Sequence, residues 1–256
     1  MLLVISPAKK LDFSPVEIEN NLSKPLFQKD ATNLANVASK LSKSELKQLM
    51  SISDKLADLN FQRFQSFKNN PTEISTKAAA FAFNGDTYIG LNIMEFSKLD
   101  LDFSQKHLRI LSGLYGLLRP LDLIQPYRLE MGSNLKNDRG HNLYQYWSDI
   151  VSNNLNLDLE KSKYNKIINL ASVEYSKVIN TKIINADIIN PQFLEEKNNT
   201  LKNVSFFSKK ARGSMARFIL KNKILNHSEI KDFNYDRYKF NPSLSSELKP
   251  VFTRKS

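Results

Sequence analysis

The sequence predicts a mixed α/β fold of the α+β class, formed as a single domain over residues 1–256. Three observations favour this prediction. The length of 256 residues is ordinary for one compact domain with a single core. Segments with helical periodicity alternate with short runs rich in β-branched residues. Neither a linker nor an internal repeat divides the sequence.

The first half of the chain is predicted to be mainly helical, because apolar side chains recur at three- and four-residue spacing through most of it. Its predicted elements are a buried strand at residues 2–5, helices at 25–49 and 53–67, and a helical or extended segment at 78–83. Ser104 is a predicted N-cap for a further helix that runs to residue 111. Gly113, Gly116 and Pro120 are predicted to end that helix.

The second half adds the strands that a sheet requires. Its predicted elements are a helix at 143–154, strands at 166–170, 181–189 and 204–207, and a helix from 209 or 210 to 225. From residue 241 onward, Asn, Pro and Ser predict a loosely ordered tail. Helices therefore separate strands along the chain, which is the pattern of a mixed α/β domain.

Composition excludes several classes of site. The absence of cysteine excludes disulfides, thiol nucleophiles and Cys-ligated iron–sulfur clusters. The three histidines are far apart in sequence, so we predict no metal site and no cofactor, although a carboxylate-only metal site stays open. No basic segment precedes the five apolar residues at the start, and no apolar run approaches about 18 residues. We therefore expect a cytoplasmic protein with no membrane partner.

The net charge of +11 is concentrated in the second half of the chain. Residues 197–228 contain eight basic residues and no acidic residue. Such a stripe is either a solvated surface or an anion-binding surface, since clustered cations attract phosphate-bearing partners. Glycine is rare, and six of the seven glycines lie between Gly85 and Gly140. We expect these glycines where the backbone closely approaches an anion or a neighbour.

The glycine-containing turn after the helix predicted from Ser104 is the first candidate site. Gly113 and Gly116 lie near Arg109 and Arg119, and no acidic residue interrupts residues 103–121. Backbone N–H groups at such a turn can bind phosphate oxygens. The alternative interpretation is a purely structural connection between two helices.

Two further candidate sites combine cations with polar neighbours. Ser6 and Lys9 follow the first predicted strand, where α/β folds place binding loops. They could bind an anion or form a catalytic Ser/Lys pair. In residues 125–132, an extended backbone places Arg128 and Glu130 on one side. This pair is either a structural salt bridge or a phosphate ligand with its orienting carboxylate or general base.

The last two candidate sites lie in the second half. Glu174 follows Ser172 directly beyond a predicted strand. Lys209, Lys210 and Arg212 are predicted to lie near the first turn of a helix, where the macrodipole disfavours cations. A nearby anion would offset that cost, so this segment is the strongest prediction of phosphate binding.

Together with other segments, these residues form motifs that run almost from end to end of the chain. The motifs are Ser6-Pro-Ala-Lys9, Ile52-Ser-Asp-Lys-Leu-Ala57 with Arg63-Phe64, Phe81-x-Phe-x-Gly-Asp-x-Tyr-x-Gly90, Leu108-Arg-x-Leu-Ser-Gly-Leu-Tyr-Gly-x-Leu-Arg-Pro-Leu-Asp122, Gln125-Pro-Tyr-Arg-Leu-Glu-Met-Gly132, Leu143-Tyr-x-x-Trp147, Asn169-Leu-Ala-Ser172, Glu174-Tyr175 and Lys209-Lys-Ala-Arg-Gly-x-Met-x-Arg-Phe218. With these motifs in this order, the chain resembles the YaaA family of bacterial peroxide stress proteins. Lys10 stands where we expect a smaller polar residue, and the tail after about residue 234 matches poorly.

The resemblance implies a central mixed sheet, a positively charged cleft, a helix-hairpin-helix element and DNA binding. It also implies a role in limiting oxidative DNA damage and free intracellular iron during peroxide stress. On this chain the hairpin would fall on residues 112–119. The cations of the cleft would be drawn from Lys9, Lys55, Arg63, Arg109, Arg119, Arg128, Lys209, Lys210, Arg212 and Arg217.

Two functions of different classes follow. In the first, the protein binds DNA mostly independently of sequence, and the cleft cations, with Ser6, Gly113 and Gly116, contact phosphates. In the second, it is an enzyme that acts on an unidentified phosphate-bearing small molecule or nucleic acid. Arg128 and Arg212 would then hold the phosphate. The acid–base groups would come from Asp86, Tyr115, Glu130 and Glu174.

Overall fold

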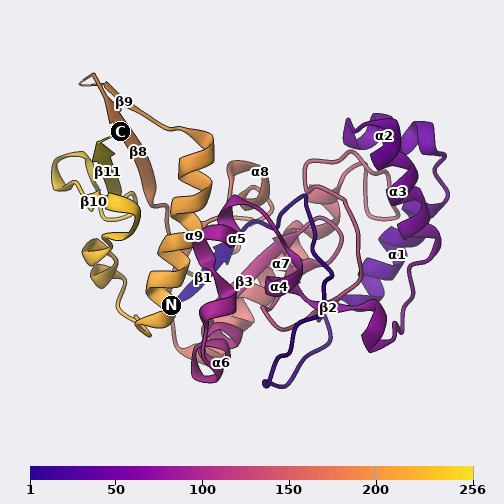
Figure 1. Cartoon of the computed structure of the whole chain (residues 1–256), viewed down its shortest axis with the longest axis horizontal. Helices are drawn as coiled ribbons and strands as arrows, with labels where there is room; N and C mark the ends of the chain where they lie inside the picture. The colour runs from indigo at the N-terminus through magenta and orange to yellow at the C-terminus, as the bar shows by residue number, and fades with distance from the viewer. Residues whose placement is uncertain (199, 256) are drawn as a thin grey trace.

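A five-stranded sheet forms the centre of the computed structural model, which describes residues 1–198 and 200–255 and confirms the mixed α/β fold (Figure 1). The strand order is β4-β3-β1-β6-β7. The strands are β1 (Leu2–Ile5), β3 (Leu108–Ser112), β4 (Gly116–Leu118), β6 (Lys166–Leu170) and β7 (Asp187–Ile189). Neighbouring strands run parallel except for β3 and β4, which are antiparallel, so the sheet is mixed.

Strand β1 lies in the middle of this sheet, with a parallel neighbour on each edge. Leu3 is in register with Leu108 of β3 and with Ile168 of β6. All four residues of β1 are fully buried, which explains why this strand is apolar along its whole length. Because β1 and β6 are parallel, their carboxyl ends meet at the same edge of the sheet.

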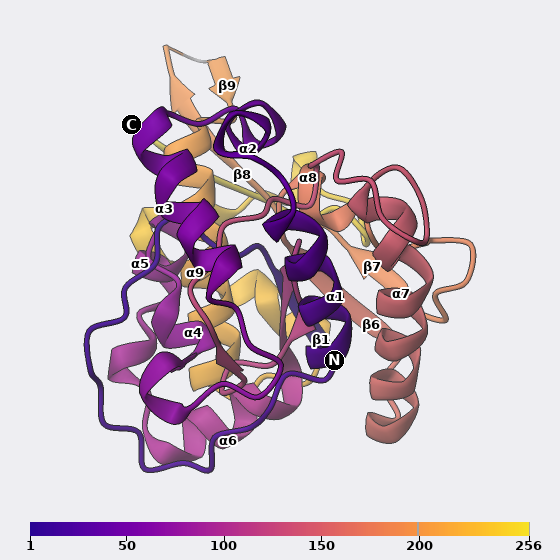
Figure 2. The same ribbon diagram turned by 90° about the vertical axis from the view of Figure 1, so that its right-hand side faces the viewer.

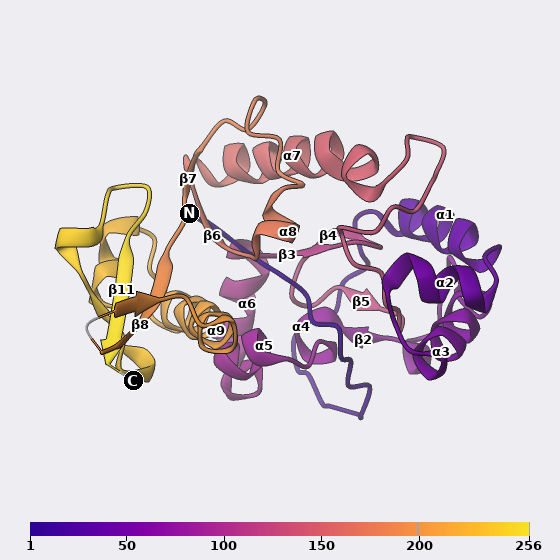
Figure 3. The same ribbon diagram turned by 90° about the horizontal axis from the view of Figure 1, so that it is seen from above.

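Helices cover both faces of the five-stranded sheet, with α7 on one face and α4, α5, α6 and α9 on the other (Figure 3). The helices near this sheet are α4 (Ala79–Ala82), α5 (Asp86–Leu91), α6 (Lys98–His107), α7 (Leu143–Ser162), α8 (Val173–Ser176) and α9 (Ser205–Lys221). The buried indole N–H of Trp147 on α7 donates a hydrogen bond to the Gly113 carbonyl oxygen at 3.0 Å. This bond ties α7 to the turn between β3 and β4.

Two smaller groups of elements lie at opposite ends of the molecule. A helical group at one end, drawn towards the viewer in Figure 2, contains α1 (Gln28–Ser39), α2 (Lys43–Met50) and α3 (Asp54–Gln65). At the other end, β8 (Gln192–Lys197), β9 (Thr200–Lys202), β10 (Lys239–Phe240) and β11 (Val251–Lys255) form a second sheet. Its strand order is β10-β11-β8-β9.

The remaining elements are short. A two-stranded ladder joins β2 (Lys77–Ala78) to β5 (Leu123–Ile124). The 3-10 helices are η1 (Glu73–Ser75), η2 (Ile93–Glu95), η3 (His227–Asp232), η4 (Tyr235–Arg237) and η5 (Pro242–Leu244).

Helices α5 and α9 pack against each other at unusually close range because glycine lies on both. A Cβ atom on Gly213 of α9 would overlap the carbonyl oxygen of Thr87. A Cβ atom on Gly90 of α5 would overlap the carbonyl oxygen of Lys210. The sequence predicted close backbone approach at glycine, and at these two positions the neighbour is another helix.

The structure corrects the prediction for residues 104–119. Helix α6 follows its N-cap Ser97 and ends at His107, and the chain then enters β3 and β4. Pairing of residues 108–110 with β1 overrides the local helical spacing. The segment at 112–119, predicted as part of a helix-hairpin-helix, is therefore a β-hairpin. Gly116 begins its second strand with a φ of +67°, which glycine adopts without strain.

Two predictions around α9 are also wrong. Residues 205–207 form the first turn of α9 rather than a strand, and Val204 is the N-cap. Lys209 and Arg212 therefore lie beyond the first turn, and the argument from the helix dipole does not apply to them.

The strand predicted at residues 181–189 is shorter in the structure. Only residues 187–189 form β7.

The predicted loose tail is ordered. Strand β11 lies between β10 and β8, and the side chains of Val251 and Phe252 are buried. Phe252 packs against Phe193 of β8 with ring centroids 5.6 Å apart. The Asn, Pro and Ser residues that suggested a loose tail form the turns around η5 that precede this strand.

Candidate functional site

A cavity of about 580 Å³, here named the strand-end cavity, lies at the carboxyl ends of β1 and β6. Helices α5, α8 and α9 supply the rest of its wall. Six residues predicted from the sequence line it: Ser6, Lys9, Asp86, Glu174, Lys209 and Arg212. Open α/β sheets commonly bind ligands at this edge.

Ser6 joins the two strand ends that form the floor of the cavity. Its Oγ accepts a hydrogen bond from the backbone N–H of Ser172 at 2.8 Å and lies 3.3 Å from Ser172 Oγ. The Tyr88 hydroxyl donates to the Ser6 carbonyl oxygen at 3.2 Å. Ser6 therefore holds the ends of β1 and β6 in position, in addition to any contact with an anion.

Arg212 is the cation of the cavity that is most removed from water. Its side chain is half-buried, and burial lowers the pKa of its guanidinium. Within residues 1–198 and 200–255, no carboxylate forms an ion pair with it. Lys209, one turn earlier on α9, is exposed at the same cavity. Even partial burial of a cation without a counter-ion costs free energy of desolvation, so a bound anion would stabilise this arrangement.

Two carboxylates line the same cavity from other elements. Asp86 lies in the first turn of α5, and Glu174 lies in α8. Glu174 Oε1 accepts a hydrogen bond from the Gly132 N–H at 3.1 Å, which orients its carboxylate. Next to Glu174, burial raises the pKa of the Tyr175 hydroxyl well above its ordinary value, and the phenol of Tyr127 adds to the effect. The cavity thus combines cations with acid–base groups.

Lys9 and Arg128 share one carboxylate beside the cavity. Glu130 Oε1 lies 3.2 Å from Lys9 Nζ, 3.2 Å from Arg128 Nε and 3.1 Å from Arg128 Nη2. Residues 127–130 belong to no strand, yet their burial alternates: Tyr127 and Leu129 are buried, whereas Arg128 and Glu130 are only partly buried. The alternation predicted for residues 127–130 is confirmed. Arg128 does not line the cavity itself. It shares the Glu130 carboxylate with Lys9, which does line the cavity and whose side chain is 65% exposed.

Arg109 and Arg119 lie elsewhere, in a separate cavity of about 390 Å³. Arg109, near the amino end of β3, pairs with Asp158 of α7 at 2.7 Å. Arg119 pairs with the fully buried Asp122 at 2.8 Å. Because β1 and β3 are parallel, this cavity and the strand-end cavity lie at opposite edges of the sheet.

Other predicted cations are also dispersed. On α9, Lys210 pairs with Asp236 at 2.8 Å, and Arg217 pairs with Glu95. Lys55 and Arg63 lie on α3, in the helical group at the far end of the molecule (Figure 2). The predicted cations therefore do not form one cleft together, because folding separates their elements.

Three further candidates lie in the core. Gly113 approaches the Leu129 carbonyl oxygen, and Gly116 packs against the ring of Trp147. Tyr115 is fully buried, and its hydroxyl oxygen accepts a hydrogen bond from the Gln125 N–H at 3.0 Å. Burial raises the pKa of this hydroxyl. Close packing explains all three residues, and none of them lines the strand-end cavity.

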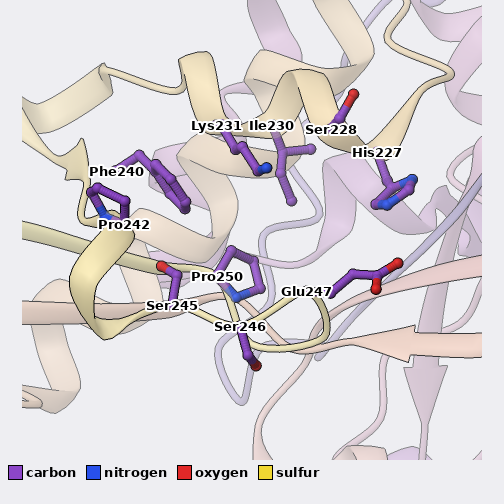
Figure 4. A pocket seen from close by; sticks show the side chains of 10 residues that line it. All are labelled: His227, Ser228, Ile230, Lys231, Phe240, Pro242, Ser245, Ser246, Glu247 and Pro250. Carbon is purple, nitrogen blue, oxygen red and sulfur yellow. The ribbon is translucent and has the colours of Figure 1, made fainter.

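The sequence did not single out four residues that line the strand-end cavity: Lys10, Asn84, Thr87 and Val173. Residues 84–86 lie within the sequence motif from Phe81 to Gly90, but only their place beside the strand ends makes them part of a site. A further cavity, of about 340 Å³, lies at the second sheet, where side chains of η3 face those of the Ser245–Pro250 loop (Figure 4). Its lining includes His227, Lys231 and Glu247, none of which was predicted.

In residues 1–198 and 200–255, no three side chains among His, Cys, Asp and Glu gather as a metal ion would require. No helix in these ranges combines the length and the apolar character needed to cross a membrane.

Relatives of this chain align with it from end to end. A family model described as "Peroxide stress protein YaaA" matches residues 1–244. A UPF0246 protein of Teredinibacter turnerae is 48% identical over 256 residues, which cover all of both chains. A UPF0246 protein of Colwellia psychrerythraea is 48% identical over 255 residues, which cover 100% of this chain and 99% of the relative. Both alignments extend through the tail, whereas the family model ends at residue 244. The chain belongs to the YaaA family of peroxide stress proteins.

Proposed function

We propose that this protein acts in the bacterial peroxide stress response by binding nucleic acid through phosphate groups at the strand-end cavity. One observation carries the proposal. Arg212 lies half-buried in that cavity without a carboxylate partner among the described residues. A guanidinium binds phosphate through two parallel hydrogen bonds, and an anion there would offset the cost of its burial.

The neighbours of Arg212 support phosphate as the anion. Lys10 and Lys209 line the same cavity, and both side chains are exposed. With Lys9, four cations line this cavity, and they suit a ligand with several negative charges, such as a nucleic-acid backbone. Contacts to phosphate carry no sequence information, so binding would be mostly independent of sequence.

Titration with labelled single-stranded and duplex DNA at several salt concentrations tests the proposal. We expect the logarithm of affinity to fall linearly with the logarithm of salt concentration. Arg212→Gln should lower the affinity for at least one of these DNAs by about tenfold or more, and flatten its salt dependence, because one phosphate contact is lost. Lys182→Gln is the matched control, since Lys182 is exposed and lies outside the strand-end cavity.

Two results would contradict the proposal. One is the absence of binding to either DNA at low salt. The other is an equal effect of Arg212→Gln and Lys182→Gln, which would assign binding to net charge rather than to the cavity.

A second candidate function is catalysis on a phosphate-bearing small molecule or nucleic acid. Asp86 and Glu174 favour it, because two carboxylates at the phosphate site are more than binding requires. One could act as a general base while Arg212 holds the phosphate. Conversion of nucleotides or oligonucleotides by the protein, and its loss in Asp86→Asn and Glu174→Gln with binding retained, would support an enzyme. Unchanged turnover in both variants would exclude this assignment of the bases.

The proposed physiological outcome is protection of DNA from oxidative damage, with an indirect effect on free iron. The peroxide stress family of the chain supports this role. Strand breakage of plasmid DNA by ferrous iron and hydrogen peroxide should decrease when the protein is added. The Arg212→Gln variant should protect less at the same concentration. Equal protection by the parent and by the Arg212→Gln variant would show that protection does not depend on the cavity.

A further inference from the structure

Two adjacent phenylalanines at the start of α9 differ in their surroundings. Phe206 is 54% exposed and Phe207 is 37% exposed. Their rings meet edge to face, with centroids 5.4 Å apart and an interplanar angle of 69°. In this arrangement the two rings are not stacked face to face.

A buried network holds Phe207 in place. The Arg254 guanidinium carbon lies 4.4 Å from the centroid of Phe207 and 4.8 Å from that of Tyr238. Both carboxylate oxygens of the buried Glu195 accept hydrogen bonds from Arg254 Nε, at 2.8 and 2.9 Å. The first turn of α9 is therefore anchored to the second sheet. Phe206 is presented on a rigid base, which lowers the entropy cost of using its ring to bind a ligand.

The exposed ring lies next to the proposed phosphate site. Phe206 and Lys209 are three residues apart on α9, so they are neighbours on one helix surface. Arg212 follows after another three residues. The rise between Phe206 and Arg212 is about 9 Å. Stacked nucleotides repeat every ~3.4 Å along a strand, so this distance corresponds to two or three of them.

We propose that Phe206 stacks on a base of single-stranded nucleic acid whose phosphates bind at Lys209 and Arg212; this inference rests on the proposed function. An exposed aromatic ring beside cations is the combination with which proteins bind single strands without reading sequence. The bases of a duplex are stacked on one another and present no free face. Phe206 therefore adds a preference for single strands to a phosphate site that alone would accept either form.

Binding of a single-stranded oligonucleotide, an abasic oligonucleotide of equal length and a duplex tests this inference. Phe206→Ala should lower affinity for the normal single strand by about 5- to 150-fold, the usual effect of losing one base–aromatic stack. Its affinity for the abasic strand and the duplex should be unchanged. Leu99→Ala is the control, since it removes a 74% exposed apolar side chain from α6, outside the strand-end cavity.

A second variant keeps an aromatic ring at position 206 and allows its stacking to be followed by fluorescence. Phe206→Trp should bind the single strand as tightly as the parent, and its fluorescence should be quenched by that strand but not by the abasic one. The background from the other tryptophan is constant, because Trp147 is fully buried.

The outcomes separate the two proposals. If Phe206→Ala binds the single strand as tightly as the parent, or loses equal affinity for the abasic strand, the stacking inference is wrong. In that case the Arg212→Gln variant still tests whether phosphate groups bind at the strand-end cavity. If Arg212→Gln leaves the affinity for all three ligands unchanged, the proposed function fails, whatever Phe206→Ala does.

Discussion

The hydroxyl of Ser6 accepts a hydrogen bond from the backbone N–H of Ser172 at 2.8 Å, across 166 positions of sequence. This bond links the residue that follows β1 to the N-cap of α8. It sets the separation of the loop that carries Lys9 and of helix α8, which carries Glu174, at the strand-end cavity. A serine that resembled a candidate nucleophile therefore also organises the site.

The first prediction concerns this bond. Ser6→Ala should lower the free energy of unfolding by about 1–3 kcal/mol, because the partly buried N–H of Ser172 loses its acceptor. Urea denaturation measures the change. Ser44→Ala, at an exposed position of α2, should shift stability by no more than about 0.5 kcal/mol. A Ser6→Ala variant as stable as this control would show that the bond contributes nothing.

Removing the shared carboxylate of Glu130 should strengthen nucleic-acid binding. Glu130→Gln releases Lys9 and Arg128 from their counter-ion, so one or two more cations become available to phosphate. The slope of log affinity against log salt should steepen by about 1–2. Glu17→Gln makes the same change of charge at an exposed position outside the cavity. Fluorescence anisotropy measures these slopes. Equal slopes in the two variants would show that Lys9 and Arg128 do not contact the nucleic acid.

Gly213→Ala has two opposing effects on the stability of the protein, one from helix propensity and one from packing. Within an exposed helix, alanine in place of glycine is favourable by about 1 kcal/mol. At Gly213 the added Cβ would overlap the backbone carbonyl of Thr87, which cannot move without shifting α5. Overpacking of this kind costs typically about 1–3 kcal/mol and more where backbone must move, so we expect net destabilisation.

The control for that substitution is Gly132→Ala. The nearest atoms to its added Cβ belong to the flexible side chain of Glu174, at 3.1 Å. Its melting temperature should stay close to that of the parent, whereas Gly213→Ala should melt well below it. Stabilisation of the protein by Gly213→Ala would mean that α5 and α9 do not pack as closely as described.

The buried His107 should make stability fall in mild acid. Burial lowers the pKa of its imidazole from the ordinary 6.5, and the nearby cations Arg109 and Lys106 lower it further. Its Nδ1 lies 3.0 Å from the Met1 carbonyl oxygen, and the ring stacks on Phe103. Since the folded pKa is the lower one, the unfolded chain binds the proton first. Stability is therefore lost as pH falls below about 6.5, until the folded pKa is reached.

Denaturation by urea at pH 7.5 and at pH 5.5 measures this effect. The free energy of unfolding should be smaller at pH 5.5 in the parent, and His107→Phe should reduce the difference. NMR titration of the His107 ring in the folded protein should give a pKa below 6.5. A value above 6.5 would reverse the sign of the effect and contradict the assignment.

The sequence by itself determined the fold class, the central strand and six of the residues that line the strand-end cavity. Residues 2–5 could only be a buried strand, because four consecutive apolar residues next to a Ser-Pro turn leave no solvent-facing side. Ser6, Lys9, Glu174, Lys209 and Arg212 could be selected because each follows a predicted strand or belongs to the basic segment. These signals are local, so one sequence is sufficient to read them.

Only the tertiary structure decided which cations are free to bind an anion. Residues 197–228 contain no acidic residue, yet Asp236, Glu95 and Asp100 from other segments pair with Lys210, Arg217 and Lys223. Ion pairs depend on distances in space, which sequence separation does not reveal. The same holds for residues 108–111, where pairing of residues 108–110 with β1 replaced a locally plausible helix by a strand. Arg212 became the centre of the site because folding buried it at the strand ends and supplied no counter-ion within the described residues.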